Sequence, residues 1–194
     1  MTRTDAPFIS AKRLVTEHRV AHDVHAEAAK LHSEAHDMHL KATAGHIKQK
    51  NSVDAVHHTG KAKEHAAKAS AHNGEAAAHK IAEHSVKAGD PKALAVAHAS
   101  AETAKESHGH AGTSLEHAKA AHGQLLAADA HQWATKADPK NAQEQADKAK
   151  EHVAIAQSHG PQHDNRPDPR KSQFDAKASH QNAVTVKQPA VKKA

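Results

Sequence analysis

The chain has 194 residues, no cysteine, 2% aromatic residues and a formal net charge of +5 when its 23 histidines are neutral. The lack of cysteine excludes disulfide scaffolds, thiolate zinc sites and thiol catalysis. Alanine dominates the apolar content, and an alanine-lined core buries little area per residue. This composition favours an elongated helical protein of modest stability, unless assembly, a partner or a metal stabilises it.

The sequence also indicates how the charge of the chain responds to pH and where in the cell the protein is expected. Histidine titrates near pH ~6.5, so full protonation would add 23 positive charges to the chain. No apolar run approaches the roughly 20 residues that span a bilayer. The stretch from Met1 to Leu14 also lacks the long apolar core of a signal peptide. We therefore expect a cytoplasmic protein without a membrane-spanning segment.

The first predicted helix follows a flexible lead of residues 1–8 and starts near Ile9. Histidine recurs along this helix at every seventh position. These residues are His18, His25, His32, His39 and His46. Alanines and larger apolar residues recur with the same period, which is typical of a helix that packs against partners. The histidine column is predicted to flank that apolar seam.

The second predicted helix spans residues 53–88, after a turn at 48–52 in which Ser52 is the expected helix cap. Histidine again occupies every seventh position. These residues are His58, His65, His72 and His79. Alanines four residues further on place these histidines at or beside the seam. Gly60 and Gly74 lower the helix propensity but permit the close approach of another helix.

Asp-Pro pairs at 90–91 and 138–139 mark the next two helix starts. Aspartate is a favourable helix cap, and proline suits the first helical position. The predicted helices span residues 91–136 and 139–158. His108 and His122 lie on an apolar column of the longer helix, where we interpret them as packed core histidines rather than ligands.

From residue 160 onward, prolines and polar residues replace the alanine pattern. This segment carries seven Lys or Arg residues against three Asp residues. We therefore predict a disordered basic tail over 160–194. The predicted fold is all-α: an elongated antiparallel helical bundle of three long helices and one short helix over 9–159, between the lead and the tail.

Histidine spacing carries the main functional hypothesis. Two histidines four residues apart share one helical face, and neutral imidazole binds Zn, Ni and Cu ions. The motif HxxxHxxH occurs twice, and its members form the first set of candidate ligands: His18, His22, His25, His32, His36 and His39. A single helix offers only two good ligands, so a second helix must complete a closed site. The second candidate set is His58, His65, His72 and His79.

The leading prediction is a non-enzymatic protein that reversibly binds or buffers a divalent transition metal. In the alternative, histidine is a semi-polar filler of an expanded Ala/His/Lys repeat. The protein is then structural or stress-protective, for example a particle component, and its charge responds to pH. Protonation below pH ~6 would loosen such a bundle by mutual repulsion. Alanine seams also favour assembly into homo-oligomers or larger arrays.

Known catalytic signatures are missing from the sequence. No Glu is followed three residues later by His, as carboxylate-bridged di-iron bundles require, and there is no HExxH, GxSxG or Gly-rich phosphate loop. Nucleic acid is a further alternative partner. Lys187, Lys192 and Lys193 stand among Ala, Pro and Val, and this end of the chain resembles linker-histone-type basic tails, which bind by counterion release.

Two wider resemblances concern the helical region. The run from Ala21 to His122, with its EAAK, KAGDPK and SHGHAG stretches, resembles small Ala/His-rich helical proteins of bacteria that have no assigned function. The Ala/Lys/Glu repeats resemble late-embryogenesis-abundant proteins, which implies a stress-protective and partly disordered chain. Neither resemblance supplies a catalytic residue.

Overall fold

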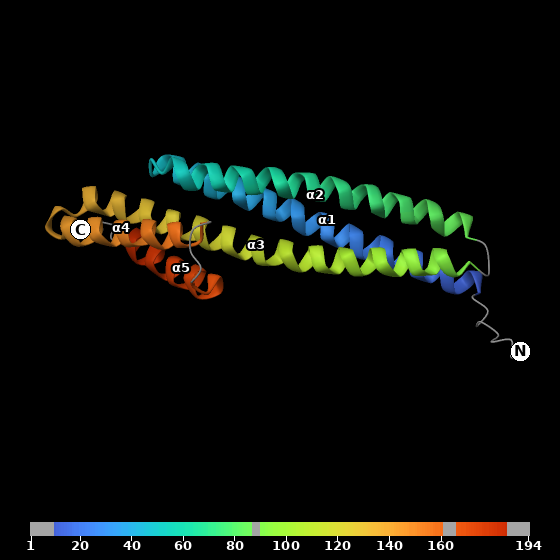
Figure 1. Ribbon diagram of the computed structural model, residues 1–194. Helices are drawn as coiled ribbons and strands as arrows, with labels where there is room; N and C mark the ends of the chain where they lie inside the picture. The colour runs from blue at the N-terminus through green and yellow to red at the C-terminus, as the bar shows by residue number, and fades with distance from the viewer. Residues whose placement is uncertain (1–9, 87–89, 161–165, 186–194) are drawn as a thin grey trace, which may run out of the picture. The chain divides into compact units, whose positions relative to one another are not determined.

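The computed structural model describes residues 10–86, 90–160 and 166–185. Its elements are α1 (Ala11–Lys48), α2 (Ser52–Ser85), α3 (Pro91–Ala137), the 3-10 turn η1 (Pro139–Asn141), α4 (Ala142–Ser158) and α5 (Pro169–Thr185), as Figure 1 shows. The described residues contain no strand, which confirms the predicted all-α class. The bounds of the first four helices agree with the predicted ones to within a few residues.

Helix α5 lies inside the segment predicted to be a disordered tail, so the prediction of a single short helix is wrong. Asp168 begins this helix, because its Oδ1 accepts hydrogen bonds from the backbone N–H groups of Arg170 and Lys171 at 2.8 and 3.4 Å. Asp90 caps α3 in the same way. The Asp-Pro pair at 168–169 therefore carries the same start signal as the other two pairs.

Several predicted segments fall outside the described residues. These are the lead at 1–8 and the parts of the predicted tail at 161–165 and 186–194. The three lysines that suggested a nucleic-acid contact belong to the last of these segments.

The turn between α1 and α2 is built around Asn51. Its backbone N–H donates to the carbonyl of His46 at 2.9 Å, and its Oδ1 accepts from the backbone N–H of Asp54 at 3.3 Å. Asn51 is thus the cap of α2, where the sequence predicted Ser52. Lys50 adopts a positive φ of 58°, which the short reversal of the chain requires.

The chain divides into two compact units. Unit 1 comprises Met1–Ser33 and His65–Gly112, so it contains the first part of α1, the second part of α2 and the first part of α3. Unit 2 comprises Glu34–Glu64 and Thr113–Ala194, and it contains the remaining parts of these helices together with α4 and α5. The helices within each unit pack side by side, with α1 and α2 antiparallel.

Alanine and histidine fill the core of each unit. Fully buried alanines include Ala21, Ala28, Ala97 and Ala104 in unit 1 and Ala35, Ala42, Ala118 and Ala121 in unit 2. His32 is 0% exposed, whereas Val24 and Leu31 are only half-buried. The histidine column therefore lies inside the core rather than beside it, because small alanines leave room between helices for the longer imidazole rings. Of the two histidines interpreted as core residues, His108 is exposed and His122 is half-buried.

Gly45 marks a close approach between α1 and α3 in unit 2. A Cβ atom at this position would lie 2.8 Å from Cδ1 and 3.1 Å from Cβ of Leu125, which is 2% exposed. No atom of the described residues lies within 4 Å of such a Cβ at Gly60 or Gly74, so the predicted role of those two glycines in close helix approach is wrong.

Replacing these glycines by alanine is expected to have opposite effects on stability. Gly60→Ala gains helix propensity without a clash and should raise the free energy of unfolding by about 0.5–1 kcal/mol. Gly45→Ala forces Leu125 to move within a packed core and should lower it by about 1–2 kcal/mol. Urea denaturation of both variants measures the difference, and equal stabilisation by both would contradict the packing described for Gly45.

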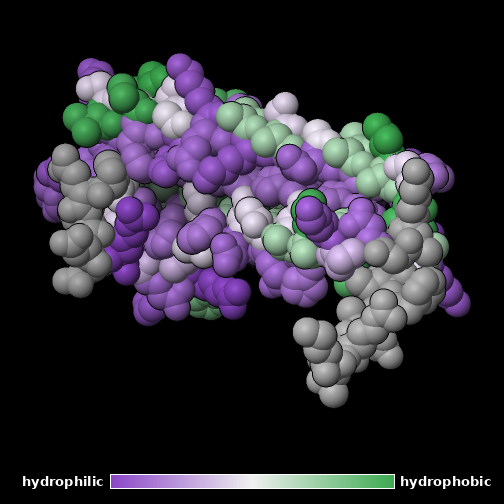
Figure 2. Space-filling view, turned by 45° about the vertical axis from the view of Figure 1, so that its right-hand side comes forward, coloured by the Kyte–Doolittle hydropathy of each residue, from purple (hydrophilic) through white to green (hydrophobic). Residues whose placement is uncertain are grey.

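Several large apolar side chains are exposed, among them Val56, Ile81 and Phe174 at 72, 70 and 74%. Figure 2 shows separate green patches on a face that is otherwise mainly purple. Such side chains are available for contacts with other molecules, although scattered exposed apolar residues are common in proteins. None of the described helices is long and apolar enough to cross a membrane.

Candidate functional site

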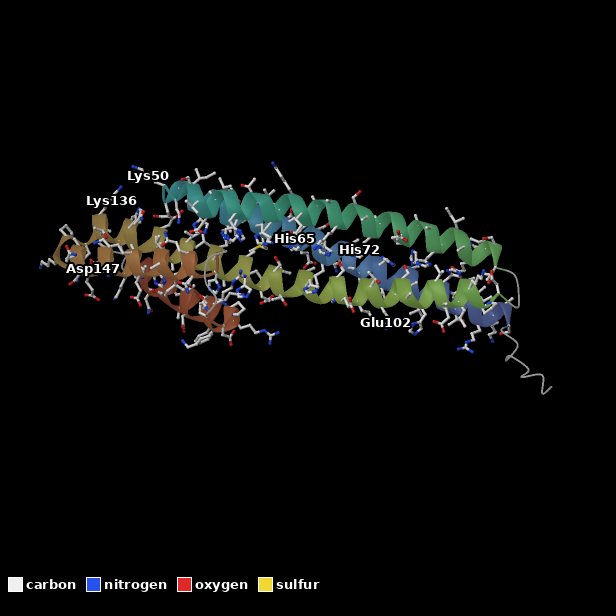
Figure 3. The ribbon with its side chains drawn as sticks, in the orientation of Figure 1. Lys50, His65, His72, Glu102, Lys136 and Asp147 are labelled. Atoms are coloured by element: carbon white, nitrogen blue, oxygen red, sulfur yellow. The ribbon has the colours of Figure 1, made fainter. Side chains whose placement is uncertain are left out.

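Histidines of α1 and α2 meet in pairs inside unit 1. Their Nδ1 atoms lie 3.0 Å apart in His18–His79, 2.9 Å in His25–His72 and 2.7 Å in His32–His65. Each step of seven residues up α1 is matched by a step of seven down α2, as the antiparallel arrangement requires. The two histidine columns predicted from the sequence therefore face each other; Figure 3 labels His65 and His72 on α2.

Serines of α3 join these pairs into one series. Ser100 Oγ lies 2.8 Å from Nε2 of His25 and 2.9 Å from Nε2 of His79. Ser107 Oγ lies 2.9 Å from Nε2 of His32 and 2.8 Å from Nε2 of His72. We call each set of one serine and two histidines a serine-bridged layer. Continuous hydrogen bonding therefore runs from His18 through both layers to His65.

The two rings of each serine-bridged layer are stacked. The ring centroids lie 5.6 Å apart at an interplanar angle of 28° in His25–His79, and 5.4 Å apart at 18° in His32–His72. This near-parallel stacking aims both Nε2 atoms at the same hydroxyl.

The series in unit 1 can be satisfied entirely by neutral histidines. A neutral imidazole carries one N–H, so one ring donates and the other accepts in each Nδ1–Nδ1 contact. With the proton on Nδ1 of the α1 rings, the α2 rings donate from Nε2 to serine, whose hydroxyl donates to the next α1 ring. Burial lowers the pKa of His25, His72 and His79, which favours this neutral state.

Unit 2 continues the pattern with one difference. His39 contacts His58 through Nδ1 atoms at 2.8 Å, and its Nε2 lies 3.0 Å from Ser114 Oγ. His46, the last member of the α1 column, is 0% exposed and stacks on His58. Both ring nitrogens of His46 and the Nε2 atom of His58 lack a hydrogen-bond partner among the described residues.

A second polar series in unit 2 joins α3, α4 and α5. His117 contacts His159, whose Nε2 lies 3.0 Å from Ser172 Oγ. Further along, Ser179 Oγ lies 2.8 Å from His131 Nε2 and 2.7 Å from His152 Nε2. Glutamine replaces histidine at two places in this series, since Gln124 contacts His152 and Gln145 contacts His131. The arrangement of two histidines around one serine, seen in unit 1, therefore recurs in unit 2 at His131, His152 and Ser179.

One cluster has the composition and spacing of a metal site. The ligand atoms of His25, Glu75 and His79 all lie within 4.8 Å of one another. Both histidines are buried and the glutamate is exposed, so the cluster reaches from the core to the surface of unit 1. Burial is the largest cause of the lowered pKa of both histidines, and neighbouring histidines lower it further. The negative charge of Glu75 raises the pKa of both by a smaller amount.

The structure places the predicted ligands in two different environments. Eight of them form the buried columns that meet across helices: His18, His25, His32, His39, His58, His65, His72 and His79. His22 and His36 are only half-buried. Their Nδ1 atoms contact Asp23 Oδ1 and the Ala62 carbonyl, both at 2.9 Å. Facing helices, not the HxxxH pairs of one helix, therefore bring imidazoles together.

Sequence reasoning missed Glu75 and the serines that complete the layers. Ser100, Ser107 and Ser114 recur at every seventh position of α3, and this spacing could have revealed them. Glu75 has no comparable signal, because it is one of many exposed acidic residues. Comparison of the chain with known proteins gives no match among protein-family models, curated proteins or solved structures.

Proposed function

We propose that the protein reversibly binds a divalent transition metal, such as Zn, Ni or Cu, and does so without catalysing a reaction. The observation that carries this proposal is the His25, Glu75 and His79 cluster. Two imidazoles and one carboxylate form a ligand set that suits these ions, with a further position left for water. Burial keeps the pKa of both histidines low, so their lone pairs are available at neutral pH.

The neighbouring histidines support this role. If His25 and His79 present Nε2 to the ion, each carries its proton on Nδ1. These N–H groups can then donate to Nδ1 of His72 and Nδ1 of His18, at 2.9 and 3.0 Å. Hydrogen bonds of this kind orient a ligating imidazole and increase its basicity.

The same geometry explains why binding would be reversible. Ser100 Oγ already lies within 2.9 Å of both Nε2 atoms, whereas a Zn–N bond is about 2.0–2.1 Å long. An ion must therefore displace the serine hydroxyl and draw the two rings together. This competition lowers the affinity and favours exchange of the ion over permanent retention. Exposed Glu75 gives the ion a route from the solvent.

Calorimetric titration of metal-free protein with Zn, Ni and Cu tests the proposal. Wild-type protein is expected to bind saturably, and His79→Ala and Glu75→Gln should each weaken one equivalent by about tenfold or more. His22→Ala is the matched control, because His22 lies on α1 outside the buried column. Equal binding by wild type and His79→Ala, or weak non-saturating uptake, would reject the cluster as a metal site.

A second candidate function rests on the buried histidines themselves. Burial lowers the pKa of His58 to about 2 and of His159 to about 4, so both are neutral in the folded protein. A structural protein built this way would stay folded at neutral pH and unfold in acid. The exposed apolar side chains fit the assembly of such a protein into homo-oligomers.

A further inference from the structure

The serine column of α3 ends one step early. Ser100, Ser107 and Ser114 are each paired with the α1 histidine found 75 positions earlier, at His25, His32 and His39. By the same spacing, the position that corresponds to His46 is residue 121, which is an alanine with 0% exposure. This layer therefore has two histidines and a methyl group where the others have two histidines and a hydroxyl.

The histidine rings of this layer keep the geometry of a serine-bridged layer. The ring centroids of His46 and His58 lie 5.2 Å apart at an interplanar angle of 16°. These values match the serine-bridged pairs of unit 1, at 5.6 Å and 28° and at 5.4 Å and 18°. The stacking thus persists in a layer whose α3 residue offers no hydrogen bond.

Both rings are almost completely shielded from solvent. His46 is 0% and His58 is 1% exposed, and the Nε2 atom of each lacks a partner among the described residues. An unpartnered buried nitrogen is energetically unfavourable, so a species that binds both atoms would stabilise the fold. Neutral imidazole nitrogen is a good ligand for borderline metal ions.

The surrounding charges also suit a cation. Burial lowers the pKa of His46, and the negative charge of Asp54 raises it by a smaller amount. Asp54 is only 9% exposed, so a nearly buried carboxylate acts on this ring. Gly160 leaves space for that carboxylate, because a Cβ there would lie 2.8 Å from Asp54 Oδ1. The other titratable groups that act on the two rings are His39, His57 and His159.

We propose that His46 and His58, stacked beside Ala121, form a buried site for a divalent transition metal, with Asp54 balancing its charge. A metal ion entering a serine-bridged layer must break two hydrogen bonds, whereas here it breaks none. The site shares the chemistry of the proposed function but none of its residues, so the two proposals can fail separately.

The reciprocal pair Ala121→Ser and Ser107→Ala tests the inference. Ala121→Ser supplies the missing hydroxyl, and it is expected to lower the affinity of one Zn²⁺ equivalent by at least tenfold in calorimetric titration. Ser107→Ala removes the hydroxyl between His32 and His72, and the variant is expected to bind one more equivalent of Zn²⁺ than the wild type. Co²⁺ absorption should show loss of imidazole ligation in Ala121→Ser and in His46→Ala, while circular dichroism checks that each variant is folded.

Metal binding by the variants at Ala121, His46 and His79 either supports or rejects the site at His46 and His58. One equivalent of metal that Ala121→Ser and His46→Ala weaken, and whose affinity His79→Ala leaves unchanged, supports the site, whether or not His79→Ala weakens a second equivalent. An identical isotherm for wild type and Ala121→Ser overturns it. Absence of Zn²⁺ binding by the wild type, with a higher melting temperature in Ala121→Ser, also overturns it, because the layer then accommodates water rather than metal. Weakening by His79→Ala alone supports only the cluster of His25, Glu75 and His79.

Discussion

Lowering the pH from 7.5 to 4.5 is expected to unfold most of the helical structure. Burial lowers the pKa of His58 and His159 in the folded chain below the unfolded value of about 6.5, so the unfolded state binds more protons below that pH. Stability is therefore fully present above pH ~6.5 and falls as the pH drops toward the folded pKa. For His159 the loss extends to about pH 4, and for His58 to about pH 2.

The magnitude is large compared with the stability of a typical domain. Each histidine contributes about 1.4 kcal/mol per pH unit between its two pKa values. At pH 4.5 His58 and His159 together destabilise the fold by about 5 kcal/mol. The free energy of unfolding of a typical domain is about 5–15 kcal/mol. Burial also lowers the pKa of His25, His46, His72, His79, His122 and His152.

The cause differs from the mutual repulsion expected from the sequence. For His58, burial is the largest contribution to the lowered pKa, and the charges of His39, His46, His57 and His159 add to it in the same direction. Desolvation of the charged ring is thus the main reason why protonation opposes folding. Repulsion between neighbouring imidazolium groups acts second.

Circular dichroism between pH 7.5 and 4.5, with urea denaturation at several pH values, measures this loss. His159→Gln is the matched variant, because Gln124 and Gln145 stand in the α3–α4 series where other steps have histidine. The slope of unfolding free energy against pH should fall by about 1.4 kcal/mol per unit in this variant. Helicity that stays constant down to pH 4.5 would contradict the description of a neutral histidine core.

Replacing His32 by alanine is expected to destabilise the protein by about 3–5 kcal/mol. The ring is 0% exposed, with Nδ1 2.7 Å from His65 Nδ1 and Nε2 2.9 Å from Ser107 Oγ. Removing it leaves a cavity and deprives His65 of a buried contact, and both effects are costly. The measurement is the urea midpoint at pH 7.5.

His22→Ala is the control for this substitution. The His22 side chain is 33% exposed, and its contact is with Asp23, which is 65% exposed. Surface pairs of this kind contribute little, so a change within about 0.5 kcal/mol is expected. His32→Gln should fall between the two, because glutamine keeps one polar contact. Equal effects of His32→Ala and His22→Ala would mean that the buried column does not stabilise the fold.

The predicted helices succeeded where the sequence contains both a period and a boundary signal. Seven-residue spacing identified the columns of α1 and α2, and Asp-Pro pairs identified the starts of α3 and η1. An Asp-Pro pair also stands at 168–169, but the prolines and polar residues around it predict a tail where α5 forms. Local composition was a poorer guide there than the capping signal, because a cap acts on the backbone directly.

The candidate site was only partly predictable. Spacing of four residues placed His22 beside His18 on one helix, and this suggested shared ligands. In the structure His18 lies opposite His79, while His22 contacts Asp23. A periodic sequence states which residues share a helical face, but it does not state which residues of another helix lie opposite them.

The sequence by itself determined the all-α class, the approximate bounds of the first four helices and the two histidine columns, since periodicity and capping are properties of a single helix. Only the tertiary structure decided that these columns form the core, that α3 serines bridge them, and that Glu75 joins His25 and His79. The reason is the register between helices. It is set by the turn at Asn51 and by close alanine packing, and neither can be read from one helix alone.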